Sequence, residues 1–152
     1  MALYLEFDLI VRRFARAKLR YAVAGGLAVG LHGYVRATQD MDFLMHKKDL
    51  VRAKGILLKM GYRINPGVQE FARAGLTLNR LFKRLPKEED LMLVDILIPT
   101  SALMLRVLER AVLVSYGKTS IRVVTANDLV KMKRLRGSIA DKADIEFLRK
   151  KQ

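Results

Sequence analysis

The chain has 152 residues, of which 51% are hydrophobic, so it is long enough and apolar enough to bury a core. It holds 29 Lys and Arg against 15 Asp and Glu, which gives a formal net charge of +14. The absence of cysteine excludes disulfides, thiolate chemistry and cysteine-based metal sites. The positive charge favours a nucleic acid or another polyanion as partner, and a solvated basic surface is the alternative.

The first residues do not resemble a secretory leader, because Glu6, Asp8 and Arg12 interrupt their apolar run. The longest uncharged stretch, YAVAGGLAVGLHGYV, contains four glycines. It is shorter than the roughly 20 apolar residues that cross a bilayer. Together with the lack of cysteine, these features lead us to expect a cytoplasmic protein with no membrane partner.

Helix-like and strand-like segments alternate along the chain. In chain order, the spacing of apolar residues predicts a helix at residues 3–19, a strand at 21–24, a helix at 27–32, a strand at 42–45, a helix at 47–60, strands at 76–85 and 91–98, a helix at 101–110, strands at 112–115 and 121–124, and helices at 125–136 and 139–150. This order indicates a mixed α/β (α+β) fold around a small sheet. No repeat or linker divides the chain, so we expect a single domain over residues 1–152.

Two carboxylates stand two residues apart in the segment QDMDFLM. On a strand, Asp40 and Asp42 project to one face, while Met41 and Phe43 project to the other. Because like charges repel, both acids stay ionised only where a cation or water screens them. Mg²⁺ or Mn²⁺ with substrate phosphates would provide such a cation, so the pair is a candidate metal cradle. An exposed loop would explain the same pair without any function.

A third acid, Asp95, lies in the otherwise apolar segment LMLVDILI. A buried carboxylate needs a cation or a hydrogen-bond donor, because burial without one is costly. A structural ion pair with an arginine is one explanation. The other is that three carboxylates on neighbouring strands form the ligand set that phosphoryl and nucleotidyl transfer require.

The glycine pair Gly25–Gly26 lies between the predicted strand at 21–24 and the predicted helix at 27–32. Glycine lets the backbone approach a phosphate closely, and a helix N-terminus presents N–H groups to it. A tight turn that needs glycine is the alternative. The spacing matches neither the P-loop nor the G-x-G-x-x-G fingerprint.

Together these features form the segment GGLAVGLHGYVRATQDMDFLM, which closely resembles the signature of the nucleotidyltransferase fold shared with polymerase beta, in its minimal bacterial form. The likeness is greatest to the nucleotidyltransferase-like toxins of abortive-infection (AbiEii-type) and related toxin–antitoxin systems. The matching residues are Gly25, Gly26, His32, Gly33, Arg36, Thr38, Asp40 and Asp42, with Asp95 at the position of the third acid. The resemblance implies a small mixed sheet flanked by helices, with the C-terminal helices packed on it.

The resemblance also implies roles for single residues. Asp40, Asp42 and Asp95 would bind metal and act in catalysis, and Asp95 would help to activate the acceptor. Gly25 and Gly26 would hold the triphosphate of an NTP substrate.

The segment between the glycines and the acids holds three further candidates. Arg36 and Thr38 would shape the loop before the acids or, in the case of Arg36, contact a nucleotide phosphate. His32 is expected to make a structural hydrogen bond near the end of a helix rather than to act in catalysis.

The predicted helix at 125–136 carries two cations on its apolar stripe. Leu129, Met132, Lys133 and Arg136 follow helical spacing and share one face. Lys133, and with weaker support Arg136, would satisfy this placement by facing the acids or a nucleotide phosphate, as a lysine does in similar proteins. The alternatives are snorkelling to solvent, or pairing with Asp141 and Asp144 of the last helix.

The sequence leaves three functions open. The first is transfer of a nucleoside monophosphate from an NTP to a hydroxyl of tRNA or protein, in a toxin with a cognate antitoxin. The second is a catalytically silent module of the same fold that binds RNA or a protein partner. The third is a small-molecule (antibiotic) nucleotidyltransferase, against which the basic charge speaks because cationic antibiotics call for an acidic pocket.

Overall fold

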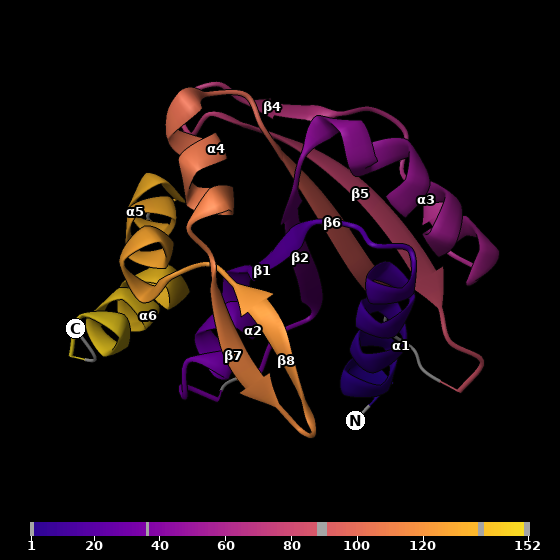
Figure 1. The fold of residues 1–152 in the computed structure, drawn as a ribbon, viewed down its shortest axis with the longest axis horizontal. Coiled ribbons are helices and arrows are strands. Elements are labelled where there is room, and N and C mark those ends of the chain that lie inside the picture. The colour runs from indigo at the N-terminus through magenta and orange to yellow at the C-terminus, as the bar shows by residue number, and fades with distance from the viewer. Residues whose placement is uncertain (1, 36, 88–90, 137–138, 151–152) are drawn as a thin grey trace.

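The computed structural model of the chain describes residues 2–35, 37–87, 91–136 and 139–150 (Figure 1). The helices are α1 (Ala2–Arg16), α2 (Gly25–Leu31), α3 (Leu50–Lys59), α4 (Ala102–Glu109), α5 (Ala126–Arg136) and α6 (Ile139–Lys150). A short 3-10 helix at Lys47–Asp49 precedes α3. The strands are β1 (Tyr21–Ala24), β2 (Asp40–Met45), β3 (Arg63–Ile64), β4 (Gln69–Phe71), β5 (Leu76–Arg84), β6 (Leu91–Pro99), β7 (Val112–Tyr116) and β8 (Thr119–Val123).

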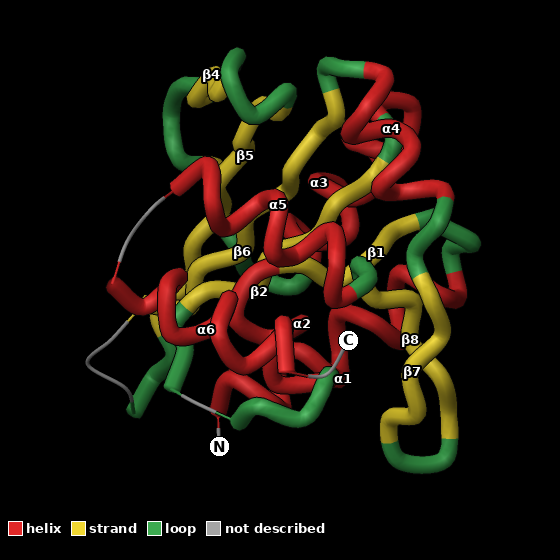
Figure 2. The backbone as a smooth tube through the Cα atoms, turned by 90° about the vertical axis from the view of Figure 1, so that its left-hand side faces the viewer, coloured by secondary structure: helices red, strands yellow, loops and turns green. Residues whose placement is uncertain are grey.

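The strands form a mixed sheet in the order β3–β5–β6–β2–β1–β8–β7, and β4 pairs with β5. β2 runs parallel to β6, and β1 runs parallel to β8, while the other pairs are antiparallel. Helices α1 and α3 cover one face of this sheet, and α4, α5 and α6 cover the other (Figures 1 and 2). The predicted mixed α/β fold with flanking helices is therefore confirmed.

Most predicted elements lie within a few residues of their observed bounds, and the differences have local causes. Helix α1 ends at Arg16 because Lys18 takes a left-handed conformation with φ of 59°. Helix α2 begins at Gly25 rather than after the glycine pair. The short strands β3 and β4 were not predicted, since they are two- and three-residue exposed segments without an apolar alternation.

The alternation along β2 separates core from pocket. Met41 and Phe43 are fully buried and face α1, where the Phe43 ring lies 5.3 Å from Phe14 and 6.0 Å from Phe7. Asp40 and Asp42 are half-buried on the opposite face, as the strand period predicts. This aromatic cluster fixes the register of β2 and so determines where the two acids emerge.

Helix α5 is fixed to its surroundings by capping and by ion pairs. The backbone N–H of Asp128 donates to the Thr125 hydroxyl at 3.1 Å, so Thr125 caps the N-terminus of the helix. The guanidinium of Arg110 donates to both carboxylate oxygens of Asp128 at 2.7 and 2.6 Å. Burial raises the pKa of Asp128, but the hydrogen bonds from Arg110 and Thr125 outweigh burial and leave that pKa below its ordinary value.

Strand β8 joins the sheet beside β1 over a short stretch. Val23 is paired with Val123, and the N–H of Val124 donates to the Val23 carbonyl at 3.0 Å. Across the same junction, His32 Nε2 lies 2.9 Å from the Val124 carbonyl oxygen. The structural hydrogen bond expected of His32 is thus present. None of the described helices is long and apolar enough to cross a membrane.

Candidate active site

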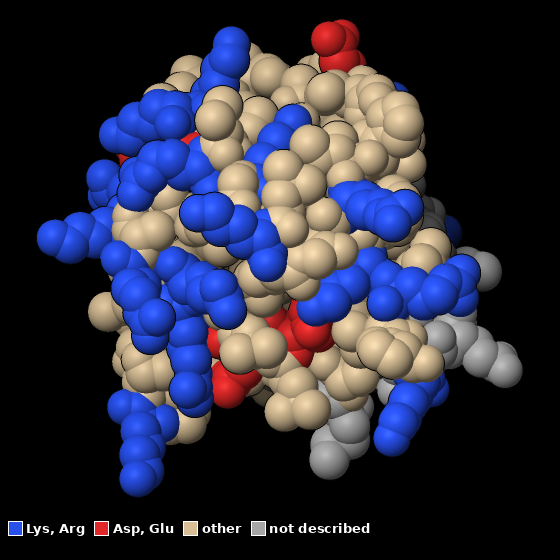
Figure 3. Space-filling view, turned by 90° about the vertical axis from the view of Figure 1, so that its right-hand side faces the viewer, with Lys and Arg blue, Asp and Glu red and all other residues tan. Residues whose placement is uncertain are grey.

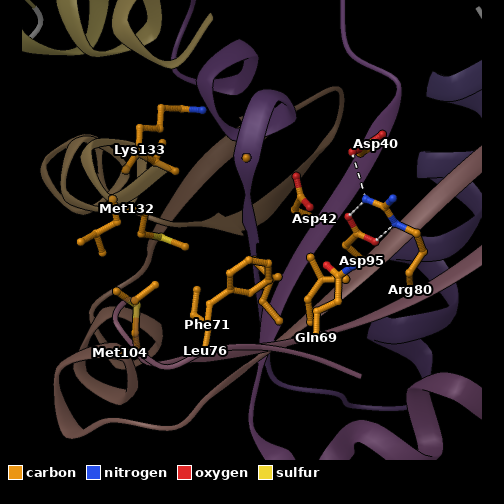
Figure 4. A pocket seen from close by; sticks show the side chains of 16 residues that line it. Asp40, Asp42, Gln69, Phe71, Leu76, Arg80, Asp95, Met104, Met132 and Lys133 are labelled. Carbon is orange, nitrogen blue, oxygen red and sulfur yellow. Dashed lines mark hydrogen bonds and ion pairs between the residues drawn. The ribbon is translucent and has the colours of Figure 1, made fainter. Parts of the chain in front are cut away.

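A pocket of about 300 Å³ lies between the sheet and helices α4 and α5 (Figure 4). Its acidic end holds Asp40 and Asp42 of β2, Asp95 of β6 and Arg80 of β5. Gln69 of β4 also lines the pocket. The remaining lining comes from Gly25, Phe71, Ala74, Leu76, Leu78, Leu97, Met104, Leu129, Met132, Lys133 and Leu135.

The strand register brings the three predicted acids together. Asp42 is directly opposite Asp95 across the parallel pair β2–β6, and Asp40 lies two residues along β2 on the same face. Asp95 is 2% exposed, whereas Asp40 and Asp42 are half-buried. Three carboxylates thus converge on one end of the pocket, as the sequence predicted.

Arg80 faces these acids from the neighbouring strand β5 (Figure 4). Its Nε donates to Asp95 Oδ1 at 2.7 Å, and its Nη2 donates to Asp95 Oδ2 at 2.8 Å. The same Nη2 lies 3.6 Å from Asp40 Oδ2. The hydrogen bonds to Asp95 raise the pKa of Arg80 above its ordinary value, so the guanidinium stays charged.

Arg80 therefore occupies both oxygens of the buried acid. Within the described residues, no group of three or more His, Cys, Asp or Glu side chains is arranged to hold a metal ion. The arginine supplies the positive charge that a buried carboxylate needs. The structural ion pair considered for Asp95 is present, and the same residue still lines the pocket.

Gly25 lies against the Asp42 side chain. It has a φ of +63°, and a Cβ atom built at this position would lie 1.9 Å from Asp42 Oδ2. This distance is far below any non-bonded contact, and the φ is one that residues with a side chain rarely adopt. The first glycine of the pair is therefore required for Asp42 to point into the pocket.

Substitution of Gly25 by alanine is expected to displace the Asp42 carboxylate and to lower stability by about 1–3 kcal/mol, because steric overlap and backbone strain act together. Gly30, in the same helix, is the matched control, since a Cβ there meets nothing within 4 Å. Gly30→Ala should be neutral or stabilise the protein by up to about 1 kcal/mol. Urea unfolding of both variants checks this, and equal stabilities would contradict the close contact.

Other predicted site residues lie elsewhere. Gly26 and Thr38 line a second hollow, beside α1 and Tyr116, rather than the pocket of the acids. The Thr38 hydroxyl donates to the Asp40 carbonyl at 3.4 Å, so Thr38 shapes the entry into β2. Arg36 and the side chain of Arg136 fall outside the described residues, so their predicted roles are not addressed.

Lys133 lines the pocket, and its side chain is 3% exposed. Its Nζ lies 3.0 Å from Oδ2 of the fully buried Asp144 on α6. The pair joins the last two helices, as the sequence suggested for Asp144. The side chain of Asp141 falls outside the described residues.

Sequence reasoning did not identify Arg80 or the neighbouring Gln69. A signal for Arg80 was present, because β5 and β6 form a hairpin whose register follows from the turn between them. Counting the same number of residues away from that turn along each of the two strands places Arg80 opposite Asp95. No comparable signal exists for Gln69, which lies on the short exposed strand β4.

Comparison with solved structures identifies the fold. The chain resembles a lincosamide antibiotic adenylyltransferase, LnuA, in its lincomycin-bound form, with 17% identity, a TM-score of 0.69, and 95% of this chain and 94% of the other covered. A nucleotidyltransferase from Thermotoga maritima gives 13% identity and a TM-score of 0.64, with 98% and 94% covered. ANT(2")-Ia in complex with adenylyl-2"-tobramycin gives 11% identity and a TM-score of 0.59, with 99% of both chains covered.

Sequence comparisons add no closer relative. No protein-family model matches the chain, and no curated protein matches it at a significant level. The structural similarity shows the nucleotidyltransferase fold and does not single out the abortive-infection toxins. The chain has the fold of the nucleotidyltransferases, with three carboxylates and an arginine at one end of its pocket.

Proposed function

We propose that the protein is a metal-dependent nucleotidyltransferase, which moves a nucleoside monophosphate from an NTP to a hydroxyl acceptor. The observation that carries this proposal is the pair Asp40–Asp42 on one face of β2, beside Gly25 and at the end of a pocket. The shared fold of the structural neighbours, which are nucleotidyltransferases by name, supports it.

The donor set fits a hard divalent ion. Asp40 and Asp42 offer carboxylate oxygens on one side of the strand, and the side chain of Asp40 is 37% exposed. Gly25 leaves the space into which Asp42 points. Asp40 and Asp42 would hold Mg²⁺ or Mn²⁺, which supplies charge neutralisation for the triphosphate when bound.

Asp95 differs from Asp40 and Asp42 in being almost fully buried and bound to Arg80. Because Arg80 donates to both of its oxygens, Asp95 first acts by holding the arginine beside Asp40. If one of these hydrogen bonds were released, Asp95 would be placed to join the metal ligands and to help activate the acceptor. Asp95 is therefore both a third acid and the anchor of a cation at the pocket.

The nucleotide would lie with its phosphates near Gly25 and Asp42. Lys133 contributes positive charge from the α5 side of the pocket, although Asp144 already partners it. Arg36, Gly26 and Thr38 stay predicted nucleotide-binding residues on the strength of the sequence signature. Arg136 stays one on the strength of its helical spacing with Lys133. The toxin role, a tRNA or protein acceptor and an antitoxin partner likewise stay predictions.

Removal of divalent ions is expected to abolish transfer, because Arg80 is already bound by Asp95 and the charges of Asp40, Asp42 and the triphosphate need the divalent ion to balance them. The measurement is incorporation of label from each α-labelled NTP into total RNA, protein and small-molecule pools, with EDTA and then with added Mg²⁺. A thermal-shift series with each NTP should show stabilisation only with Mg²⁺. Equal incorporation in EDTA would overturn the metal dependence.

An RNA-binding module is the second candidate function. Lys and Arg side chains gather over the face that α1 and α3 cover (Figure 3). We call this the basic face, and its residues are Arg12, Arg13, Arg16, Lys18, Arg20, Lys47, Lys48 and Arg52. The same segments hold three acids: Glu6 and Asp49 are buried, and Asp8 pairs with Arg12, so three acids stand against the eight cations of the basic face. The basic face lies on the side of the sheet opposite to α4 and α5.

Neutralising part of the basic face is expected to weaken RNA binding and its salt dependence. The variant Arg13→Gln, Arg16→Gln, Lys48→Gln should lower the slope of log K against log salt by about 2–3, since each phosphate contact contributes about 0.7–0.9. The control, Arg134→Gln, Lys142→Gln, Arg149→Gln, removes the same charge from α5 and α6. Filter binding of a labelled tRNA measures both, and equal losses would contradict a specific basic face.

A further inference from the structure

The pocket is apolar beyond its acidic end. Its far wall is formed by aliphatic and thioether side chains, including Leu76 of β5, Met104 of α4 and Met132 of α5 (Figure 4). Phe71 is an aromatic residue in this lining, and Gln69 lies near Arg80 and Asp95. A volume of about 300 Å³ is that of a small-molecule site rather than of an extended groove.

The charges of the pocket argue against two classes of acceptor. A polycation would need several uncompensated carboxylates, but Arg80 neutralises Asp95 and also approaches Asp40. A polyanion such as RNA would bring phosphates against a wall that has apolar side chains. The basic face that suits RNA lies over α1 and α3, on the other side of the sheet from α4 and α5 (Figure 1).

The aliphatic wall also suits an acceptor better than it suits the nucleobase. Recognition of a base edge requires donors and acceptors placed around it. In the lining described for the pocket, the polar side chains are the four at the acidic end, the single amide of Gln69, and Lys133, which is paired with Asp144. Burial of an apolar part of a ligand against Leu76, Met104 and Met132 is instead favourable.

We propose that the acceptor is a small molecule with an apolar body and a hydroxyl group, which rests on the nucleotidyl transfer proposed above. The apolar body lies against the wall of Met104 and Met132, and the hydroxyl points to Asp40 and Asp42. The hydroxyl oxygen attacks the α-phosphorus, the bond to the bridging oxygen breaks, and pyrophosphate leaves. The hydroxyl proton is released to water, so the products are a nucleoside monophosphate ester and pyrophosphate.

Hexyl β-D-glucoside is a suitable probe, because it joins six apolar carbons to a hydroxyl-bearing ring, and glucose is its polar control. We expect saturable binding on the order of 1 mM without metal or nucleotide. The readout is the spectrum of ¹³C-methyl methionine, in which Met104 and Met132 should shift while Met60 at the end of α3 stays unchanged. Glucose should shift neither pocket methyl.

Two matched variants locate the binding. Leu135 lines the pocket and is 44% exposed, while Leu9 on α1 is 47% exposed and lies outside the pocket lining. Leu135→Gln should weaken binding of the probe about tenfold, because apolar contact is lost, and Leu9→Gln should leave it unchanged. Because both positions are half-exposed on helices, neither change should unfold the protein.

The outcomes separate this inference from the proposed function. Binding of glucose as tight as that of the hexyl glucoside would overturn the inference, as would pocket-methyl shifts with tRNA or tobramycin but not with the glucoside. Equal effects of the two leucine variants would also overturn it. Binding of the glucoside without transfer from any labelled NTP and Mg²⁺ to any acceptor pool would uphold the apolar site and overturn nucleotidyl transfer.

Discussion

Replacement of Asp42 by asparagine is expected to lower nucleotidyl transfer by about 10³-fold or more. Asp42 is the acid for which Gly25 leaves room, and it stands opposite Asp95 across β2–β6. The substitution keeps the shape of the side chain and removes its charge, so metal binding and alignment of the phosphates are lost together. A loss of several kcal/mol of transition-state stabilisation corresponds to this factor.

The measurement for Asp42→Asn is the rate of label transfer at saturating NTP and Mg²⁺, with the free energy of unfolding recorded in parallel. Stability should be unchanged or slightly higher, because one of three neighbouring like charges is removed. Asp8→Asn is the control, since Asp8 is a partly exposed acid on α1 that pairs with Arg12. Transfer above a tenth of the wild-type rate would refute a role for this carboxylate.

Replacement of Arg80 by methionine is expected to lower the free energy of unfolding by about 3–5 kcal/mol. Asp95 would keep its buried position without the guanidinium that donates to both of its oxygens. Removing one partner of a buried ion pair leaves an uncompensated charge, and this is the costly case.

The double variant Arg80→Met, Asp95→Asn tests the cause of that loss. If the unpaired charge of Asp95 dominates, the double variant should be more stable than Arg80→Met alone, with a coupling energy of at least about 1 kcal/mol. Arg63→Met on the exposed edge strand β3 is the control for loss of an arginine side chain. Additive losses in urea unfolding would show that the pair contributes little.

The convergence of Asp40, Asp42 and Asp95 was predictable from local periodicity together with the family resemblance. Strand alternation fixes the face of Asp40 and Asp42, and the apolar run around Asp95 marks a central strand. The parallel pairing of β2 with β6 then places Asp95 beside Asp42. That last step is a tertiary choice, which the resemblance implied and the periodicity alone did not.

The parts of the pocket that were missed depend on contacts distant in sequence. The apolar wall joins Leu76 of β5 to Met104 of α4 and Met132 of α5, and each of these residues would read as ordinary core by itself. Lys133 was correctly placed on the inward stripe of α5. Its pairing with Asp144 was only one of several alternatives, because periodicity does not say how α6 packs against α5.

The order of strands has a consequence for synthesis of the chain. Strand β1 lies between β2 and β8, yet β8 is made about a hundred residues later than β1. Until β8 emerges from the ribosome, the apolar segment of Tyr21–Ala24 has one unpaired edge. The nascent chain thus exposes an aggregation-prone strand edge for most of its translation. Binding of chaperones to the nascent chain should decrease once the hydrogen bond from Val124 covers the free edge of β1.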